Sequence, residues 1–265
     1  EALKKKYGYE CHITWIVDKE ALVFVKDHVE RAWAYTPELG FKLQYETFDV
    51  AYGLEITPPA TFLMNLVQAK TKYGYGLALN GHPYALNPKA EYYLERAWSD
   101  VANKKNRKSY GEMIFELCEL PYEKKRYELT NYNPTYGQDF KQKHRLTKKI
   151  LGLNIGSGKR WPSKQWDEQE LTRFCKKIGT HYHILLLGGP EEKEKLPQLV
   201  LKLHKEGIKV LSNNPENSFI EFISLLDICD TVVTGDSVAL HISIGLSKKT
   251  IGLFFVTPPW EIDDF

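Results

Sequence analysis

The segment His183-Ile-Leu-Leu-Leu-Gly-Gly-Pro190 decides the fold of the C-terminal half. Its apolar run shows no alternation with polar residues, which is typical of a strand covered on both faces of a parallel sheet. Gly188-Gly-Pro190 ends the strand, and residues 191–205 continue with a helical pattern. A strand, a glycine turn and a helix in this order indicate a doubly wound α/β domain.

The alternation of strands and helices continues on both sides of this segment. Further strands are predicted at residues 150–155, 208–211, 231–234 and 250–255, and helices at residues 167–178, 218–226 and 238–246. Asp167 is a good N-cap, and Glu170 stands three residues later, as in a capping box. The pattern predicts a five-stranded parallel sheet whose ligands bind outside the carboxyl ends of its strands.

The first half follows a similar plan. Strands are predicted at residues 12–17, 31–35, 48–54 and 75–79, and helices at residues 19–29, 59–70, 91–103 and 110–117. A length of 265 residues favours two domains. We expect an N-terminal domain at residues 1–130, a turn-rich linker at residues 131–149, and a second domain at residues 150–265.

The composition is that of an ordinary globular protein, with 43% hydrophobic and 26% charged residues. A net charge of +2 is too small to indicate a nucleic-acid partner. The four cysteines lack metal-ligand spacing, so we predict reduced thiols, no metal site and a cytoplasmic protein. No window is apolar enough for a transmembrane helix, although peripheral membrane contact stays open. The chain opens at Glu1 without a methionine, which suggests a fragment.

A basic run precedes and enters the second domain. Residues 141–164 contain eight Lys or Arg and no Asp or Glu. Such a run is either a solvated interdomain face or a positive rim around an anionic ligand.

Three polar clusters follow predicted strand ends. In the first, glycines allow backbone N–H groups to approach an anion, and basic side chains neutralise phosphate. Its candidate residues are Gly156, Ser157, Gly158, Lys159, Arg160 and Lys164. The loop has neither the Walker A nor the GxGxxG pattern, so a plain turn remains an alternative.

The second cluster is the Gly188-Gly189 turn with the acids that follow it. Glu192 is a candidate for accepting hydrogen bonds from a ribose diol. Glu191 and Glu192 also fit a simpler interpretation, in which they interact with the dipole of the following helix.

The third cluster is Asp236, Ser237 and His241. Ser237 and His241 are four residues apart and would share one helix face. Asp236 is equally explained as an N-cap, and His241 as a half-buried histidine without a functional role.

Together these motifs resemble glycosyltransferase family 9, the ADP-heptose:lipopolysaccharide heptosyltransferases. The family has a glycine-rich segment with Lys-x-Trp, a Leu-Gly-Gly-x-x-Glu strand end, an Asp-Ser/Thr-Gly-x-x-His box and a final Leu-Phe-Gly-x-Thr. Here the corresponding boxes are residues 156–166, 187–192, 236–241 and 253–257. The order and spacing of the four boxes make the resemblance specific.

The resemblance implies a GT-B fold, with two Rossmann-like, doubly wound domains facing a cleft. It also implies inverting, metal-independent transfer of a heptose-like sugar from a nucleoside diphosphate, expected to be ADP, to a lipopolysaccharide-type or other glycan acceptor without a cofactor. By the resemblance, Lys164 of Lys164-Gln-Trp166 stabilises the leaving group, with Lys159-Arg-Trp161 as a second register. Glu192 takes the ribose, and Asp236, Ser237 and His241 line the sugar and phosphates.

The sequence departs from the family pattern at three places. Val238 and Phe255 stand where many members have glycine. The strand and Gly-Asp loop that carry the family's catalytic Asp would precede Glu1, so we expect the general base to be missing from this chain. Two alternatives therefore stay open beside the transferase: a catalytically incomplete nucleotide-sugar-binding module, and a GT-B sugar-nucleotide epimerase.

Overall fold

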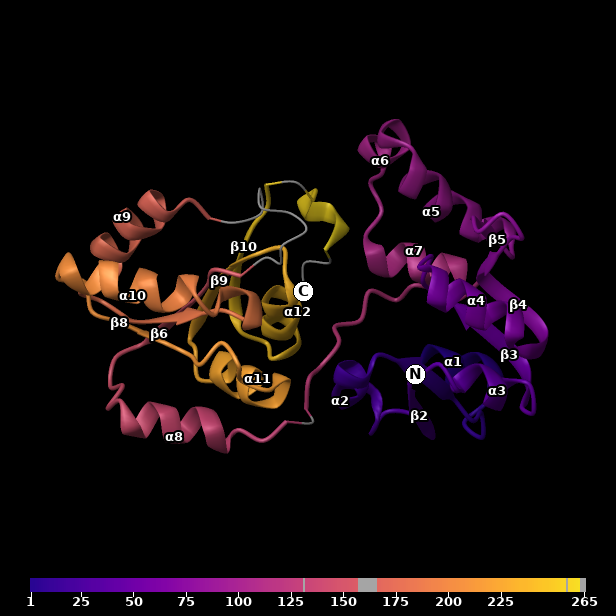
Figure 1. Cartoon of the computed structure of the whole chain (residues 1–265), viewed down its shortest axis with the longest axis horizontal. Coiled ribbons are helices and arrows are strands. Elements are labelled where there is room, and N and C mark those ends of the chain that lie inside the picture. The colour runs from indigo at the N-terminus through magenta and orange to yellow at the C-terminus, as the bar shows by residue number, and fades with distance from the viewer. Residues whose placement is uncertain (131, 157–165, 256, 263–265) are drawn as a thin grey trace. The chain divides into compact units, whose positions relative to one another are not determined.

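The computed structural model describes residues 1–130, 132–156, 166–255 and 257–262. The chain divides into two compact units (Figure 1). Unit 1 comprises Glu1–Lys125 and, after unit 2, residues 260–262. Unit 2 comprises Arg126–Pro259.

Unit 2 is built on one parallel sheet. Its strands are β6 (Ile150–Asn154), β7 (His183–Leu187), β8 (Val210–Ser212), β9 (Thr231–Gly235) and β10 (Lys249–Leu253). They lie in the order β10-β9-β6-β7-β8, and every neighbouring pair is parallel. The sequence pattern had predicted each of these five strands.

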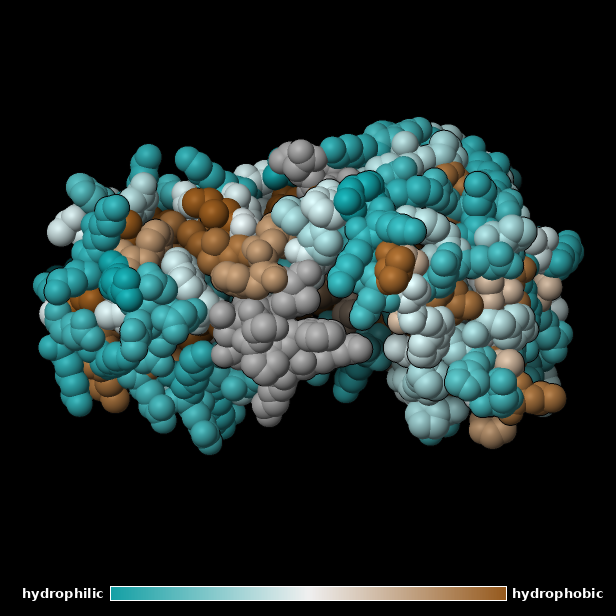
Figure 2. Space-filling view, turned by 90° about the horizontal axis from the view of Figure 1, so that it is seen from above, coloured by the Kyte–Doolittle hydropathy of each residue, from teal (hydrophilic) through white to brown (hydrophobic). Residues whose placement is uncertain are grey.

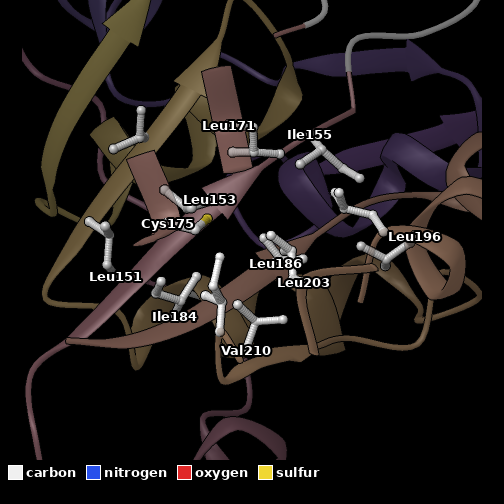
Figure 3. Close-up of a cluster of buried hydrophobic side chains, with 13 residues drawn as sticks. Leu151, Leu153, Ile155, Leu171, Cys175, Ile184, Leu186, Leu196, Leu203 and Val210 are labelled. Atoms are coloured by element: carbon white, nitrogen blue, oxygen red, sulfur yellow. The ribbon is translucent and has the colours of Figure 1, made fainter. Parts of the chain in front are cut away.

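Helices pack on both faces of this sheet. They are α8 (Thr135–Lys143), α9 (Glu168–Ile178), α10 (Lys195–Lys205), α11 (Phe219–Asp227) and α12 (Val238–Gly245). Leu171 of α9 and Leu196 of α10 pack against Leu153 and Leu186 of the central strands (Figure 3). On the opposite face, Gly152 lies against Cys229, where a Cβ would approach the sulfur to 2.8 Å.

The predicted helix caps are present in unit 2. The Asp167 carboxylate accepts hydrogen bonds from the backbone N–H groups of Gln169 and Glu170, both at 3.0 Å. Ser218 and Glu221 form a reciprocal capping box at the start of α11. These side chains satisfy N–H groups that have no partner within the helix.

Unit 1 holds two small sheets. Strands β1 (Thr14–Val17) and β2 (Arg31–Ala34) pair in parallel. The second sheet has the order β3 (Thr47–Gly53), β4 (Gln68–Leu77) and β5 (Pro83–Ala85), with β3 and β4 parallel and β5 antiparallel. One hydrophobic cluster contains Ile16 of β1 and Phe48 of β3, so the two sheets share a core.

Short helices complete unit 1. They are α1 (Ala2–Tyr7), α2 (Leu22–Val25), α3 (Leu39–Leu43), α4 (Pro58–Leu66), α5 (Pro88–Trp98), α6 (Asp100–Lys105) and α7 (Tyr110–Leu117). Short 3-10 turns occur at Lys19–Ala21 here, at Pro190–Glu192 in unit 2, and at Pro259–Glu261 where the chain passes from unit 2 back to unit 1.

The segment after unit 2 is fixed to unit 1 by polar contacts. The Arg96 guanidinium donates to the Glu261 carboxylate at 2.5 Å, and both side chains are largely buried, at 7% and 14% exposure. The Trp260 indole N–H donates to the Asn106 carbonyl oxygen at 3.0 Å, and Arg107 lies over the indole ring. This segment is therefore an integral part of unit 1.

The structure differs from the expected elements at several places. The expected linker contains α8, which packs against α11, and the Gly137 N–H donates to Ser224 Oγ at 2.7 Å. The helix expected at residues 59–70 ends at Leu66, because β4 begins at Gln68. The helix expected at residues 91–103 is broken at Ser99, whose side chain caps α6. The sequence pattern missed α3 and β5, which are only five and three residues long.

Most of the surface seen in Figure 2 is hydrophilic, with hydrophobic residues in small groups. Within the described residues, no helix is both long and apolar enough to span a membrane.

We expect Gly137→Ala to lower the free energy of unfolding of unit 2. A Cβ at this position would lie 2.1 Å from the Ser224 carbonyl oxygen, which can move only if α11 shifts. The gain in helix propensity is about 1 kcal/mol, whereas overpacking costs about 1–3 kcal/mol, so we expect the clash to dominate. Urea denaturation measures the change, with the exposed neighbour Gln138→Ala as control. A variant as stable as the wild type would contradict the α8–α11 contact.

Candidate functional site

The candidate site lies in unit 2, where the strand order reverses. From β6 the chain proceeds to β7 on one side, while β9 pairs with β6 on the other side. In open parallel sheets, ligands bind outside the carboxyl ends of the strands at such a switch point. The second and third predicted clusters, and Gly156 of the first, lie at the ends of β6, β7 and β9.

Asn154 joins the ends of β6 and β9. Its side-chain amide nitrogen donates to Thr234 Oγ1 and to Ser237 Oγ, both at 3.1 Å, and to the Gly156 carbonyl oxygen at 2.8 Å. The two hydroxyls of Thr234 and Ser237 lie 2.9 Å apart. Asn154 is 8% exposed and Thr234 is 1% exposed, so this network is largely buried and fixes the ends of β6 and β9 at the switch point.

Ser237 is the N-cap residue of α12, but its side chain makes no cap hydrogen bond. The hydroxyl instead joins the Asn154 network. The first N–H groups of a helix have no intrahelical partner and favour an anion. Val238, the first residue of α12, is 53% exposed and stands beside this helix end.

Glu192 is buried at the end of β7. Its Oε2 accepts a hydrogen bond from the Gly189 N–H at 2.9 Å. A Cβ on Gly156 would lie 2.7 Å from the same oxygen, so the absence of a side chain at Gly156 makes room for the carboxylate. Among the described residues, no hydrogen bond reaches Oε1 of Glu192, which leaves one carboxylate oxygen for a ligand.

Asn213, just after β8, fixes the turn that carries Glu192. Its side chain accepts from the Gly188 N–H at 3.0 Å and donates to the Gly188 carbonyl oxygen at 2.9 Å. The sequence pattern gave no role to Asn154 and Thr234, which begin the first and third clusters, and it missed Asn213 altogether. The available signal was a buried polar side chain at a strand end, which rarely lacks a hydrogen-bonded role.

Asp236 follows β9, and its Oδ2 accepts from Thr257 Oγ1 at 2.6 Å. This contact links the third cluster to the residues after β10. The N-cap role that the sequence left open for Asp236 is wrong, because Ser237 occupies the N-cap position of α12, and the Asp236 carboxylate instead joins two neighbouring strand ends.

His241 lies one turn into α12 and is an exposed residue. The Tyr127 hydroxyl lies 3.4 Å from His241 Nδ1 and 3.0 Å from the His241 carbonyl oxygen, to which it donates. Desolvation lowers the pKa of the His241 imidazole, while the Asp236 carboxylate opposes this shift. Tyr127 is a further contact that the sequence pattern did not predict.

Five of the candidate site residues lie outside the described residues, namely Ser157, Gly158, Lys159, Arg160 and Lys164. Among the described site residues, Glu192 lies close to Gly156 and accepts a hydrogen bond from the Gly189 N–H. Ser237 accepts a hydrogen bond from Asn154. Over the same ranges, no group of three or more His, Cys, Asp or Glu side chains is arranged to hold a metal ion.

The model of glycosyltransferase family 9 (heptosyltransferase) matches residues 38–263. This chain belongs to glycosyltransferase family 9. The family predicted from the four boxes is confirmed.

Solved structures of glycosyltransferases share the fold. A family 9 glycosyltransferase from Veillonella parvula DSM 2008 superposes with a TM-score of 0.73 at 17% identity, covering 98% of this chain and 76% of that one. The ADP-heptose lipopolysaccharide heptosyltransferase II of E. coli gives a TM-score of 0.66 at 16% identity, covering 95% and 77%. These matches confirm the predicted α/β fold class with parallel sheets, that of GT-B glycosyltransferases.

A curated relative is lipooligosaccharide heptosyltransferase 2 of Campylobacter jejuni subsp. jejuni serotype O:6 (strain 81116 / NCTC 11828). It is 22% identical over 233 residues, which cover 86% of this family 9 chain and 66% of the relative. The match thus spans just under two thirds of the relative's length.

We expect the His241 imidazole to titrate below its ordinary pKa of 6.5. The unfolded chain then binds this proton at a higher pH than the folded chain, so this group makes the free energy of unfolding fall as the pH drops below 6.5. Asp236→Asn removes a negative charge that favours the imidazolium, so the titration midpoint of His241 should lie lower in this variant than in the wild type. NMR titration of the His241 ring protons measures the midpoint in both proteins, and Asp167→Asn is the control. A midpoint that rises in Asp236→Asn would contradict the assignment.

Proposed function

We propose that this family 9 protein is an inverting, metal-independent glycosyltransferase. It transfers a heptose-like sugar from a nucleoside diphosphate, with ADP as the preferred carrier, to a lipopolysaccharide-type or other glycan acceptor. The observation that carries the proposal is the Asn154–Thr234–Ser237 network beside the buried Glu192 carboxylate, at the switch point of a family 9 fold. The E. coli fold relative is an ADP-heptose lipopolysaccharide heptosyltransferase, which supports the choice of donor.

The donor is assigned to the carboxyl edge of the unit 2 sheet. Glu192 accepts hydrogen bonds from the ribose hydroxyls through Oε1, which receives no hydrogen bond from the described residues, while the Gly189 N–H donates to Oε2. Ser237 and the α12 N-terminus face the phosphates, and Asp236 and His241 line the transferred sugar. The segment with Gly156, Ser157, Gly158 and Lys159 completes the phosphate cradle in this proposal.

The chemistry follows from the charge that develops on departure of the diphosphate. Breaking the sugar–phosphate bond places negative charge on the leaving oxygen, which cationic and N–H donors must stabilise. Lys164 is the proposed cation, so the reaction needs neither a divalent metal nor a cofactor. A general base must take the proton of the acceptor hydroxyl. A cytoplasmic location and contact with the membrane surface stay predictions.

A transfer assay tests the proposed function. The protein is incubated with ADP-heptose and a truncated lipopolysaccharide core, and products are followed by mass spectrometry. We expect release of ADP together with a heptosylated core whose new bond has the inverted anomeric configuration. Binding of ADP without transfer would favour the catalytically incomplete module, and altered donor stereochemistry without an acceptor would favour the epimerase.

We expect Glu192→Gln to weaken ADP binding by about 10-fold or more. A hydrogen bond to a charged group contributes about 1.5–3 kcal/mol, and about 1.4 kcal/mol corresponds to a factor of ten. Calorimetric titration with ADP measures the change. Its exposed neighbour Glu191→Gln is the matched control and should bind ADP like the wild type. Equal affinities in the two variants would refute the ribose role.

We expect Lys164→Ala to weaken ADP binding strongly, because the variant loses a charge-assisted contact to phosphate. The same titration applies, with Lys176→Ala on α9 as control. The slope of affinity against salt concentration should also be smaller in Lys164→Ala, since one phosphate contact is gone. Unchanged ADP affinity would indicate that Lys159, the lysine of the second Lys-x-Trp register, contacts the phosphate instead.

A further inference from the structure

Residues 126–129, which open unit 2, lie against α12. The Arg126 guanidinium donates to the Ile244 carbonyl oxygen from Nη2 at 2.9 Å and from Nε at 3.2 Å. The Leu129 N–H donates to the Gly245 carbonyl oxygen at 3.0 Å. The last carbonyl groups of a helix have no partner within the helix. The segment satisfies two of them and is thereby fixed in place along α12.

Gly245 allows this close approach. A Cβ at Gly245 would lie 2.9 Å from Leu129 Cγ and 3.2 Å from Tyr127 Cε2. The described last turn of α12 contains no basic residue, so the Arg126 guanidinium supplies the positive charge that a helix C-terminus favours. Tyr127 stands between Arg126 and Leu129, and its position therefore follows from contacts on both sides of it.

Two contacts of the Tyr127 hydroxyl bear on the protonation of His241. A carbonyl oxygen only accepts hydrogen bonds, so the hydroxyl is the donor in its 3.0 Å contact with the His241 carbonyl oxygen. A hydroxyl carries a single proton. In the 3.4 Å contact with Nδ1 the same hydroxyl is therefore the acceptor, and the imidazole is the donor. This geometry favours the neutral ring that carries its proton on Nδ1 and a lone pair on Nε2.

The second ring nitrogen is open to a ligand. Within the described residues, no hydrogen bond reaches Nε2 of His241, and the residue is exposed. An unprotonated Nε2 accepts a hydrogen bond from a hydroxyl group, but it has no proton to donate to a phosphate oxygen. The tautomer with the proton on Nδ1 therefore selects a sugar hydroxyl over a phosphate.

We propose that Tyr127 is a positioning residue that holds His241 in the Nδ1–H tautomer, so that Nε2 accepts a hydrogen bond from a hydroxyl of the transferred sugar. This role rests on the proposed function, in which His241 lines the sugar. It assigns His241 to a sugar hydroxyl and leaves the phosphates to Ser237 and the N-terminus of α12.

Nitrogen NMR of the whole chain tests the tautomer. The histidines are isotope-labelled, and the His241 signals are assigned by their loss in His241→Gln. At a pH well above the imidazole pKa, we expect a protonated Nδ1 in the wild type. We expect a protonated Nε2 in Tyr127→Phe, because free histidine prefers that form once the Tyr127 contact is gone.

The matched control is Tyr136→Phe, which removes a hydroxyl that accepts from Asn217 in unit 2. This variant should retain the wild-type tautomer of His241. A wild-type His241 with its proton on Nε2 would overturn the proposal, and so would an unchanged tautomer in Tyr127→Phe.

Donor titrations test the consequence for the sugar. The probes are ADP-heptose and ADP, and calorimetry measures both affinities on the same samples. We expect Tyr127→Phe to bind ADP-heptose about three- to ten-fold more weakly than the wild type, the range for one neutral hydrogen bond. It should bind ADP like the wild type. Equal weakening of both ligands would indicate that loss of the hydroxyl displaces α12, a purely structural role that contradicts the proposal.

A double-mutant cycle separates positioning from packing. In His241→Gln a side-chain amide replaces the ring, and its oxygen accepts a hydrogen bond without a choice of tautomer. Because Tyr127 acts through the imidazole, adding Tyr127→Phe to His241→Gln should cause no further loss of ADP-heptose affinity. A further loss as large as that in the wild-type background would refute the positioning role.

Failure of the proposed function gives a different result. A wild-type chain that binds neither ADP nor ADP-heptose would refute the donor assignment, whatever the tautomer of His241. Equal and normal binding of both ligands by the wild type and Tyr127→Phe, together with a changed tautomer, would refute the sugar contact of Nε2 alone.

Discussion

The side chain of Asn154 is the constraint on which the candidate site depends. Parallel strands β6 and β9 pair along β6 as far as its last residue, Asn154, which lies opposite Thr234. The Asn154 carboxamide extends the contact beyond this pairing and fixes Gly156, Thr234 and Ser237 at once. Because all these groups are buried or half-buried, loss of one donor would leave several acceptors without partners.

At the end of β7, hydrogen bonds from side-chain and backbone groups again fix the site residues. Asn213 holds both backbone polar groups of Gly188, and Gly189 holds one oxygen of Glu192. Glycines at positions 156 and 188 leave the space that the Glu192 side chain fills. A flexible loop would present a carboxylate only part of the time. In this structure the surrounding residues orient the Glu192 carboxylate before a ligand binds, so binding costs little further conformational entropy.

Much of unit 2 could be predicted from sequence because its strands are short apolar runs bounded by glycine and capping residues. The caps at Asp167 and Ser218 are local interactions, which a linear pattern reports well. The Asn154 network could not be predicted in this way, since its partners are 80 and 83 residues away. In unit 1, the start of β4 was missed because Gln68 and Lys70 also suit a helix, and pairing with β3 overrides that preference.

The return of the chain to unit 1 at Trp260 has a consequence for the order of folding. Unit 2 is continuous in sequence, whereas unit 1 is assembled from two segments separated by all of unit 2. On a ribosome, every residue of unit 2 emerges before Glu261 can reach Arg96. Until then the Arg96 guanidinium lacks its acidic partner. Unit 1 therefore acquires its full stability only after unit 2 has been synthesised, although its own sequence begins first.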